Sequence, residues 1–273
     1  MATIVLLEHQ LQPRLGIPYM AHLFAQHWER WGHRVLYHRG VSAPPAADLA
    51  ILHVDLTVVP EPYRELASRY PRVLNARTWD IRKSAYSQAR VRKGDPWTGQ
   101  VLVKTDANHG GHVDDALRRM ALAEGLANDV PQRSLMDHYY LCDSQARVPD
   151  SIWETPGVLV EKFVPELDAG GGYHLRVYTF CGKEERSTRY RSDEPLVRAA
   201  NYVSREPVEV PPVVRRWREE MGFDIGKLDY VLHDGQFVLL DANRTPAAPG
   251  HFASDPGVAA SFERLAHGIE GFL

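Results

Sequence analysis

The feature that most constrains this chain is a pair of alternating apolar segments separated by an Asp-Gly turn. Residues 226–232 read Gly-Lys-Leu-Asp-Tyr-Val-Leu, residues 236–241 read Gln-Phe-Val-Leu-Leu-Asp, and His-Asp-Gly lies between them. Alternation of this kind is typical of strands, and Asp-Gly favours a tight hairpin turn. The sequence therefore predicts a β-hairpin near the C-terminal end of the chain.

This hairpin carries oxygen ligands that the strand geometry can bring together. Side chains alternate between the two faces of a strand, so Lys227, Asp229 and Val231 share one face of the first strand. By the same alternation, Asp241 and Asn243 share one face of the second strand. Carboxylate and amide oxygens suit Mg²⁺, which makes Asp229, Asp241 and Asn243 candidate metal ligands. The alternative is that these acids end their strands and face water.

The first part of the chain alternates between strand and helix patterns. Apolar runs at 4–7, 34–37 and 49–54 read as strands, and residues 19–31 and 62–70 read as helices. Alternating elements predict a small parallel α/β lobe, which we place at residues 1–78. No Gly-x-Gly-x-x-Gly sequence occurs in it, so we predict no dinucleotide site there.

A strand, a glycine turn and a helix follow in the middle of the chain. Residues 101–104 read Val-Leu-Val-Lys, residues 108–111 read Asn-His-Gly-Gly, and residues 113–127 have the composition of a helix. A lysine at a strand end can neutralise phosphate while backbone N–H groups of the next turn surround the anion. Lys104 and this turn are therefore a candidate phosphate site, although a strand-end lysine is more often solvated.

Two further strands contain candidate ligand groups. Residues 161–164, Glu-Lys-Phe-Val, offer backbone polar groups and an aromatic ring that a purine could use, although alone they form only an amphipathic strand. In residues 173–180, Arg176 lies between Leu175 and Val177, so its side chain points to the opposite face. If that face borders a ligand, the guanidinium is available to oxygen-rich groups.

Charge and composition exclude some classes of function. The net charge is −3 with 13 His counted as neutral, which provides no overall positive field for a nucleic-acid backbone. We therefore expect no nucleic-acid partner. Cys142 and Cys181 lack the spacing of a zinc or redox motif and fit reduced thiols in a cytoplasmic protein. The first apolar run has no basic residues before it and an acid directly after it, so we expect a buried strand and no membrane association.

The order of these candidates resembles the ATP-grasp superfamily over about residues 70–250. It is most similar to the branch that holds glutathione synthetase, D-alanine:D-alanine ligase and the glutamate-adding ligase RimK. In that branch an Asn precedes a phosphate-side lysine, as Asn75 precedes Lys83 here, and a Val-Lys strand with a glycine loop follows. An adenine-binding strand, an arginine strand and two metal-binding strands come next, in the order found in this chain.

The resemblance implies an ATP-grasp fold of the α/β class with α+β lobes. The Rossmann-like lobe at 1–78 would precede a central lid lobe with its linker at 79–165. A C-terminal lobe at 166–273 would carry the metal and substrate residues. ATP and two Mg²⁺ ions are implied as cofactors, with Mn²⁺ as an alternative ion, and a homodimer is left open.

The resemblance also implies a role for individual residues. The ATP-binding set would be Lys83, Lys104, Asn108, Gly110, Gly111, Glu161, Lys162, Phe163, Val164, Asp168, Val231 and Leu240. Asp168 would hold the ribose, with Glu166 as the second choice. The metal ligands would be Asp229, Asp241 and Asn243, and the catalytic residues would be Arg176, Arg198 and Lys227. Of these, Arg198 lies in the arginine-bearing segment that follows the arginine strand in RimK-like enzymes.

The chain departs from the family pattern at several positions. Thr105 replaces the proline that commonly follows the strand lysine, and His109 and His112 lie where Gly and Ser are usual. Asp241 replaces a glutamate and is shorter by one methylene, while His174 replaces the first Asp of the arginine strand. These departures concern the phosphate loop, one metal ligand and the arginine strand, not the order of the elements.

The function implied is an ATP-dependent ligase that activates a carboxylate as an acyl phosphate and joins it to an amine. The partners would then be small-molecule or peptide carboxylates and amines. Two alternatives use the same residues: a kinase that phosphorylates a small molecule, and a protein that binds ATP as a regulatory ligand without turnover.

Overall fold

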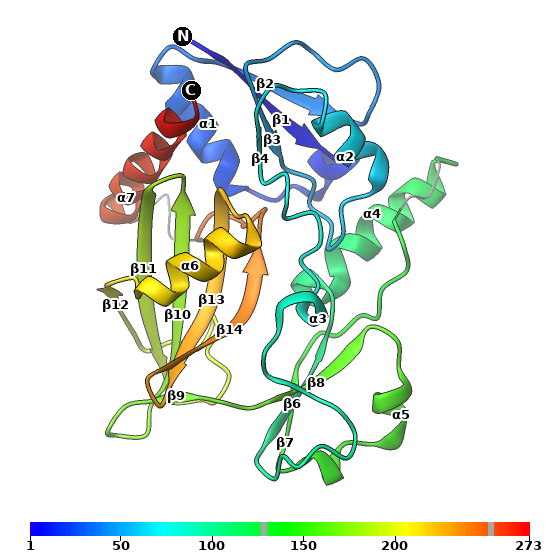
Figure 1. Ribbon diagram of the computed structural model, residues 1–273, viewed down its shortest axis with the longest axis vertical. Coiled ribbons are helices and arrows are strands. Elements are labelled where there is room, and N and C mark those ends of the chain that lie inside the picture. The colour runs from blue at the N-terminus through cyan, green and yellow to red at the C-terminus, as the bar shows by residue number, and fades with distance from the viewer. Residues whose placement is uncertain (127–129, 251–253) are drawn as a thin grey trace.

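The computed structural model describes residues 1–126, 130–250 and 254–273. Within these ranges the strands form three sheets, one in each of the expected N-terminal, central and C-terminal lobes (Figure 1). None of the helices in the described part of the chain combines the length and the apolar character needed to cross a membrane.

The N-terminal lobe is built on a parallel sheet with the strand order β2-β1-β3-β4. Its elements are β1 (Thr3–Glu8), η1 (Gln12–Leu15), α1 (Met20–Arg30), β2 (Arg34–Arg39), β3 (Leu49–Leu52), α2 (Glu61–Ala67) and β4 (Val73–Leu74). Ile4 to Leu7 are fully buried, as expected for a central parallel strand with helices on both faces. The predicted parallel α/β lobe is confirmed.

The central lobe contains a small sheet in the order β5-β8-β6-β7. Its elements are α3 (Lys83–Tyr86), β5 (Arg90–Val91), β6 (Val101–Thr105), η2 (Asn108–Gly111), α4 (His112–Ala123), β7 (Tyr140–Cys142), η3 (Gln145–Arg147), α5 (Asp150–Glu154) and β8 (Val158–Lys162). The predicted helix at 113–127 is α4, which ends at Ala123, and residue 127 lies outside the described residues. Leu117 and Ala121 of α4 pack into the core of the N-terminal lobe, whereas the sheet has an apolar cluster of its own.

The C-terminal lobe contains the largest sheet, in the order β12-β11-β10-β13-β14 with β9 paired to β10. Its elements are β9 (Glu166–Leu167), β10 (Tyr173–Cys181), β11 (Glu184–Ser192), β12 (Ser204–Val208), α6 (Pro212–Met221), β13 (Ile225–His233), β14 (Gln236–Asn243), α7 (Pro256–Ala266) and η4 (His267–Phe272). One face of this sheet is covered by α6, and α7 lies beside α1 of the N-terminal lobe (Figure 1).

The predicted hairpin is confirmed as β13 and β14, which pair antiparallel. Lys227 is opposite Asn243, and Asp229 is opposite Asp241. A bulge between Asp229 and Tyr230 shifts the register beyond this point. Because Asp229 and Asp241 are direct cross-strand partners, two carboxylates lie side by side where like charges would repel.

The N-terminal and C-terminal lobes are joined by buried polar contacts and a common core. Arg244, which is 1% exposed, donates hydrogen bonds to the carbonyls of Thr78 at 2.7 Å and Val54 at 3.2 Å, and also to that of Leu56. The side chain of Asn75 donates to Ile225 O at 2.8 Å. Apolar residues of α1 and α7 belong to one cluster. These two lobes therefore pack as one unit.

Candidate active site

A cavity of about 230 Å³ lies between the central sheet and the six-stranded sheet. Strands β6 and β8 line one side, and β10, β13 and β14 line the other. Eleven predicted site residues line it: Lys83, Lys104, Glu161, Lys162, Phe163, Val164, Arg198, Asp229, Val231, Leu240 and Asp241. The fold thus collects residues from distant parts of the sequence around one space.

Two lysines of this lining are almost completely buried. Lys83 Nζ lies 3.1 Å from Asp241 Oδ1 and donates to Ala107 O at 2.8 Å. Lys104 Nζ forms an ion pair with Glu161 and donates to Leu240 O at 3.1 Å. The exposed fractions of Lys83 and Lys104 are 1% and 2%, so the solvated alternative for Lys104 is wrong. Buried ammonium groups need such partners because desolvation is costly.

The surroundings of the two lysines act on their pKa values in opposite directions. Burial lowers the pKa of Lys104, and the nearby charge of Lys83 acts the same way against the attraction of Glu161. Burial also disfavours charge on Lys83, but the combined effect of Asp241, Tyr139 and Glu161 outweighs burial, so the pKa of Lys83 is raised. An anion placed near Lys104 would favour its charged form.

The paired carboxylates also differ in their surroundings. Burial raises the pKa of Asp229, and the charge of Asp241 adds to this effect. Lys227 opposes the rise, because its Nζ donates to Asp229 Oδ2 at 2.9 Å. Burial also acts on Asp241, but Lys83 and then Lys227 hold the pKa of Asp241 below its ordinary value. A cation between the two carboxylates would relieve their mutual repulsion.

Two carboxylate oxygens of the cavity are left without donors. Asp229 Oδ1 and Glu161 Oε1 are buried, and neither has a hydrogen-bond partner within the described ranges. Buried polar atoms without partners are rare and point to a missing ion or water. Carboxylate oxygens are the ligands that Mg²⁺ prefers, so the donors present here fit a hard divalent cation.

Two tyrosines of the site were missed by the sequence reasoning. Tyr86 on α3 donates to Asp241 Oδ1 at 3.3 Å and accepts from Ala242 N at 3.1 Å. Tyr139 lines the cavity just before β7, where burial raises the pKa of its phenol against the influence of Lys83. Neither tyrosine lies in a motif or a periodic segment that could have singled it out.

Asn243 and Lys227 lie beside the cavity but are not part of its lining. Asn243 is 3% exposed, and its side-chain oxygen accepts from Thr245 N at 2.8 Å. The Thr245 hydroxyl lies 3.3 Å from the same oxygen but donates its single proton to Asp55 Oδ1 at 2.6 Å. The amide oxygen therefore keeps one lone pair for a further ligand, and the metal ligand role of Asn243 stays a prediction.

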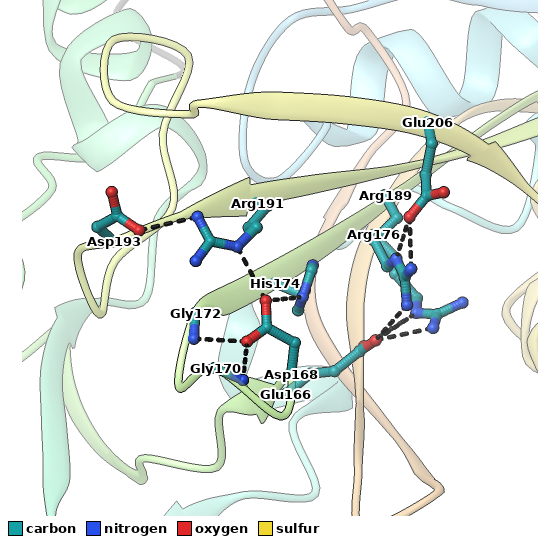
Figure 2. A network of polar contacts seen from close by, with 10 residues as sticks. All are labelled: Glu166, Asp168, Gly170, Gly172, His174, Arg176, Arg189, Arg191, Asp193 and Glu206. Atoms are coloured by element: carbon teal, nitrogen blue, oxygen red, sulfur yellow. Dashed lines mark hydrogen bonds and ion pairs between the residues drawn. The ribbon is translucent and has the colours of Figure 1, made fainter.

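Arg176 is also outside the lining, because its guanidinium is paired with Glu166 (Figure 2). Its Nη2 donates to Glu166 Oε1 at 2.7 Å, and its Nε lies 2.9 Å and 3.0 Å from the two carboxylate oxygens. Glu166 Oε2 also accepts from Leu232 N at 2.8 Å. In this structure Arg176 therefore joins β9 to β10, and its proposed role in the reaction stays a prediction.

Asp168, the first choice for the ribose, is held in a separate network (Figure 2). Its carboxylate accepts from Gly170 N at 2.8 Å, from Gly172 N at 2.9 Å and from Arg191 Nε at 2.8 Å. The Arg191 contact and the backbone donors hold the pKa of Asp168 well below its ordinary value. His174 lies next to Asp168 and also lines the cavity. Both ribose candidates thus have arginine partners here.

The glycine turn is packed tightly but does not line the cavity. Gly110 and Gly111 have φ values of 67° and 84°, which favour glycine. A Cβ at Gly110 would lie 2.7 Å from Met136 O, and one at Gly111 would lie 3.0 Å from Ser134 O. The backbone N–H of Asn108 donates to the Thr57 hydroxyl at 3.0 Å. The turn is therefore fixed by neighbouring backbone, and its phosphate contact stays a prediction.

Comparison with solved structures agrees with the architecture described above. A RimK domain ATP-grasp protein from Sphaerobacter thermophilus is 14% identical, with a TM-score of 0.52 over 99% of this chain and 100% of that one. A RiPP-associated ATP-grasp ligase from Chryseobacterium gregarium, solved with ADP and a leader and core peptide, is 8% identical, with a TM-score of 0.55 over 100% and 98%. The macrocyclase MdnC from Microcystis aeruginosa, bound with precursor peptide MdnA, is 9% identical, with a TM-score of 0.52 over 97% and 98%.

No family model matches the sequence, and a search of curated proteins gave no match. The structural similarity nevertheless extends over nearly the whole chain in each of these three proteins. The chain has the ATP-grasp fold, as the order of its motifs implied.

Proposed function

We propose that this protein is an ATP-dependent ligase that activates a carboxylate as an acyl phosphate and joins it to an amine. The observation that carries the proposal is the convergence of Lys83 and Lys104 with Asp229 and Asp241 around one cavity. Basic groups for phosphate and hard oxygen ligands for a divalent cation are the two requirements of phosphoryl transfer from ATP. The shared fold with proteins described as ATP-grasp ligases supports the same conclusion.

Each group of residues has a physical task in this reaction. Lys83 and Lys104 would bind phosphate oxygens, and residues 161–164, at the end of β8 and just beyond it, would bind the purine. Asp229 and Asp241 would hold Mg²⁺, which when bound offsets the phosphate charge during attack by the carboxylate. Two ions are proposed, with Mn²⁺ able to replace Mg²⁺. Arg198 lines the cavity and would stabilise the oxyanion that forms when the amine attacks the acyl phosphate.

A peptide is a reasonable first substrate to test. Two of the structurally similar proteins were solved with peptides: the Chryseobacterium gregarium ligase with a leader and core peptide, and MdnC with its precursor peptide. For this chain we propose that the carboxylate or the amine is carried by a peptide, with free amino acids as the small-molecule alternative.

The test is ADP release measured with Mg²⁺, ATP and pairs of candidate carboxylates and amines. A ligase should release ADP only when a carboxylate is present, and hydroxylamine should trap the acyl phosphate as a hydroxamate. ADP release with an alcohol and no hydroxamate would identify a kinase instead. ATP binding without turnover across the whole panel would count against the ligase.

A further inference from the structure

A second group of polar side chains lies in the N-terminal lobe, outside the candidate active site. Glu8 ends β1, His53 directly follows β3, and His22 lies near the start of α1. The carboxyl ends of β1 and β3 meet at one edge of the parallel sheet, which is where open α/β sheets bind ligands. One ligand atom from each of the three side chains lies within 4.8 Å of the others.

The three side chains are in direct contact. His22 Nε2 lies 2.5 Å from Glu8 Oε1, and His53 Nδ1 lies 3.7 Å from the same oxygen. Glu8 and His53 have side chains that are only 1% exposed, whereas the side chain of His22 is 32% exposed. The group is therefore buried on the sheet side and reachable from solvent on the helix side.

Two buried side-chain atoms of these residues lack hydrogen-bond partners among the described residues. Glu8 Oε2 and His53 Nε2 have no hydrogen-bond partner among the residues that the structure describes, although Arg39 Nε lies 3.5 Å from Glu8 Oε2. Orphaned buried polar atoms require an explanation, and an absent ion is one of the few available.

We propose that Glu8, His22 and His53 bind one divalent transition-metal ion, for which Zn²⁺ is the probe. Two imidazoles and one carboxylate form a ligand set typical of Zn²⁺ and related ions, whereas Mg²⁺ prefers oxygen ligands alone. Three protein ligands leave a coordination position for water or for a further ligand.

Neighbouring residues hold the ligands in place. Gln12 Nε2 donates to His53 O at 3.0 Å and lies 3.3 Å from His53 Nδ1. The ring of Tyr19 packs edge-on against His22 and His53, with centroids 5.3 Å and 5.0 Å apart. Its hydroxyl donates to Asp55 Oδ2 at 2.7 Å. Outer contacts of this kind orient metal ligands and raise affinity.

The experiment uses the full chain after removal of metal with a chelator. Zn²⁺ is titrated against a coloured competing chelator, with Mg²⁺ present in millimolar excess. We expect one Zn²⁺ per chain, and binding at least about tenfold weaker in Glu8→Gln and in His22→Gln. His27→Gln is the matched control, because His27 is on the same helix but lies 3.7 Å from Glu263 instead.

The outcomes separate this site from the candidate active site, because no ATP turnover is measured. The proposal fails if the unmodified protein binds Zn²⁺ no more tightly than Glu8→Gln, or if His27→Gln loses as much affinity. Circular dichroism checks the fold of each variant. If the variants do not fold, the visible absorption spectrum of Co²⁺ bound to the unmodified protein tests the proposal. We expect the intense bands of a four- or five-coordinate ion. The weak bands of a hydrated ion would overturn the proposal.

Discussion

At the scale of single residues, the two opposed carboxylates of the hairpin are unequal. Asp241 contacts Lys83, whereas Asp229 contacts Lys227 and keeps one oxygen without a donor among the described residues. Burial and the neighbouring acid therefore raise the pKa of Asp229, while the lysines lower that of Asp241. This inequality leaves Asp229 the better placed of the two to take up a cation.

Asp229→Asn and Asp241→Asn should each lower Mg²⁺-dependent ADP release by at least about a hundredfold, because each removes one charge from the proposed metal site. ADP release is measured over a range of Mg²⁺ concentrations. Asp234→Asn, in the turn of the same hairpin with a side chain 91% exposed, is the matched control and should keep normal activity. Near-normal release by either site variant would remove that residue from the metal site.

Lys104→Met should weaken ATP binding while leaving adenosine binding unchanged, because the proposed ligands of Lys104 are phosphate oxygens. Methionine keeps an apolar chain of similar length but removes the charge. Calorimetry with ATP and with adenosine measures both affinities. Equal loss for the two ligands would assign Lys104 a structural role through its ion pair with Glu161.

Arg176→Gln should lower the free energy of unfolding by about 3 kcal/mol at neutral pH, because the buried carboxylate of Glu166 loses its ion-pair partner and keeps only the donor Leu232 N. Burial disfavours the charged form of Glu166, but its contact with Arg176 opposes burial, and the pKa of Glu166 is lowered in the folded state. The stabilisation of the folded state by this ion pair is therefore present above the pKa of a glutamate in the unfolded chain, near 4.3. It is lost as the pH falls below this value and through the lower pKa of folded Glu166.

Urea unfolding of the unmodified protein and Arg176→Gln at several pH values tests this account. The difference between the two should shrink below about pH 4. A difference in unfolding free energy that is constant with pH would contradict the ion-pair explanation. A large loss of kcat without loss of stability would instead support the proposed role of Arg176 in the reaction.

At the scale of elements, the glycine turn η2 can be tested against a turn of similar backbone conformation. Gly110 and Gly125 have φ values of 67° and 63°. An added Cβ would lie 2.7 Å from Met136 O at Gly110, whereas at Gly125 it would meet nothing within 4 Å. Gly125→Ala should cost about 1 kcal/mol from the left-handed conformation alone. Gly110→Ala should cost more, because of its contact with Met136 O.

Urea unfolding of both alanine variants measures these costs. Equal losses would show that the contact with residue 136 is relieved easily and that η2 is not held by its neighbours.

Local sequence patterns predicted helices and strands better than they predicted which side chains contact one another. The hairpin was predictable because its alternation and its Asp-Gly turn are contained in a few residues. The burial of Lys83 was not, since its partner Asp241 is distant in sequence and lysines are usually exposed. The Thr245 contacts of Asn243 and the Glu166 pair of Arg176 likewise depend on how segments meet. Tyr86 and Tyr139 belong to no pattern.

At the scale of the whole molecule, the connection between the N-terminal and C-terminal lobes depends on Arg244. Arg244→Met should lower the free energy of unfolding by about 3 kcal/mol or more, because three buried carbonyls lose a charged donor. Thermal unfolding and urea titration measure the loss. Arg215→Met, which removes a partly exposed arginine on α6, is the control and should change stability little.

The joint made by Arg244 fixes the spacing between the two lobes it connects. Groups at the edge of the first sheet and groups on the hairpin are therefore held at a constant separation, while the central sheet packs around its own apolar cluster. A ligand that contacts both of these lobes must therefore have a length that matches the distance between them. A molecule bound between the central sheet and the hairpin would instead lie between elements that Lys83 and Lys104 join to β14.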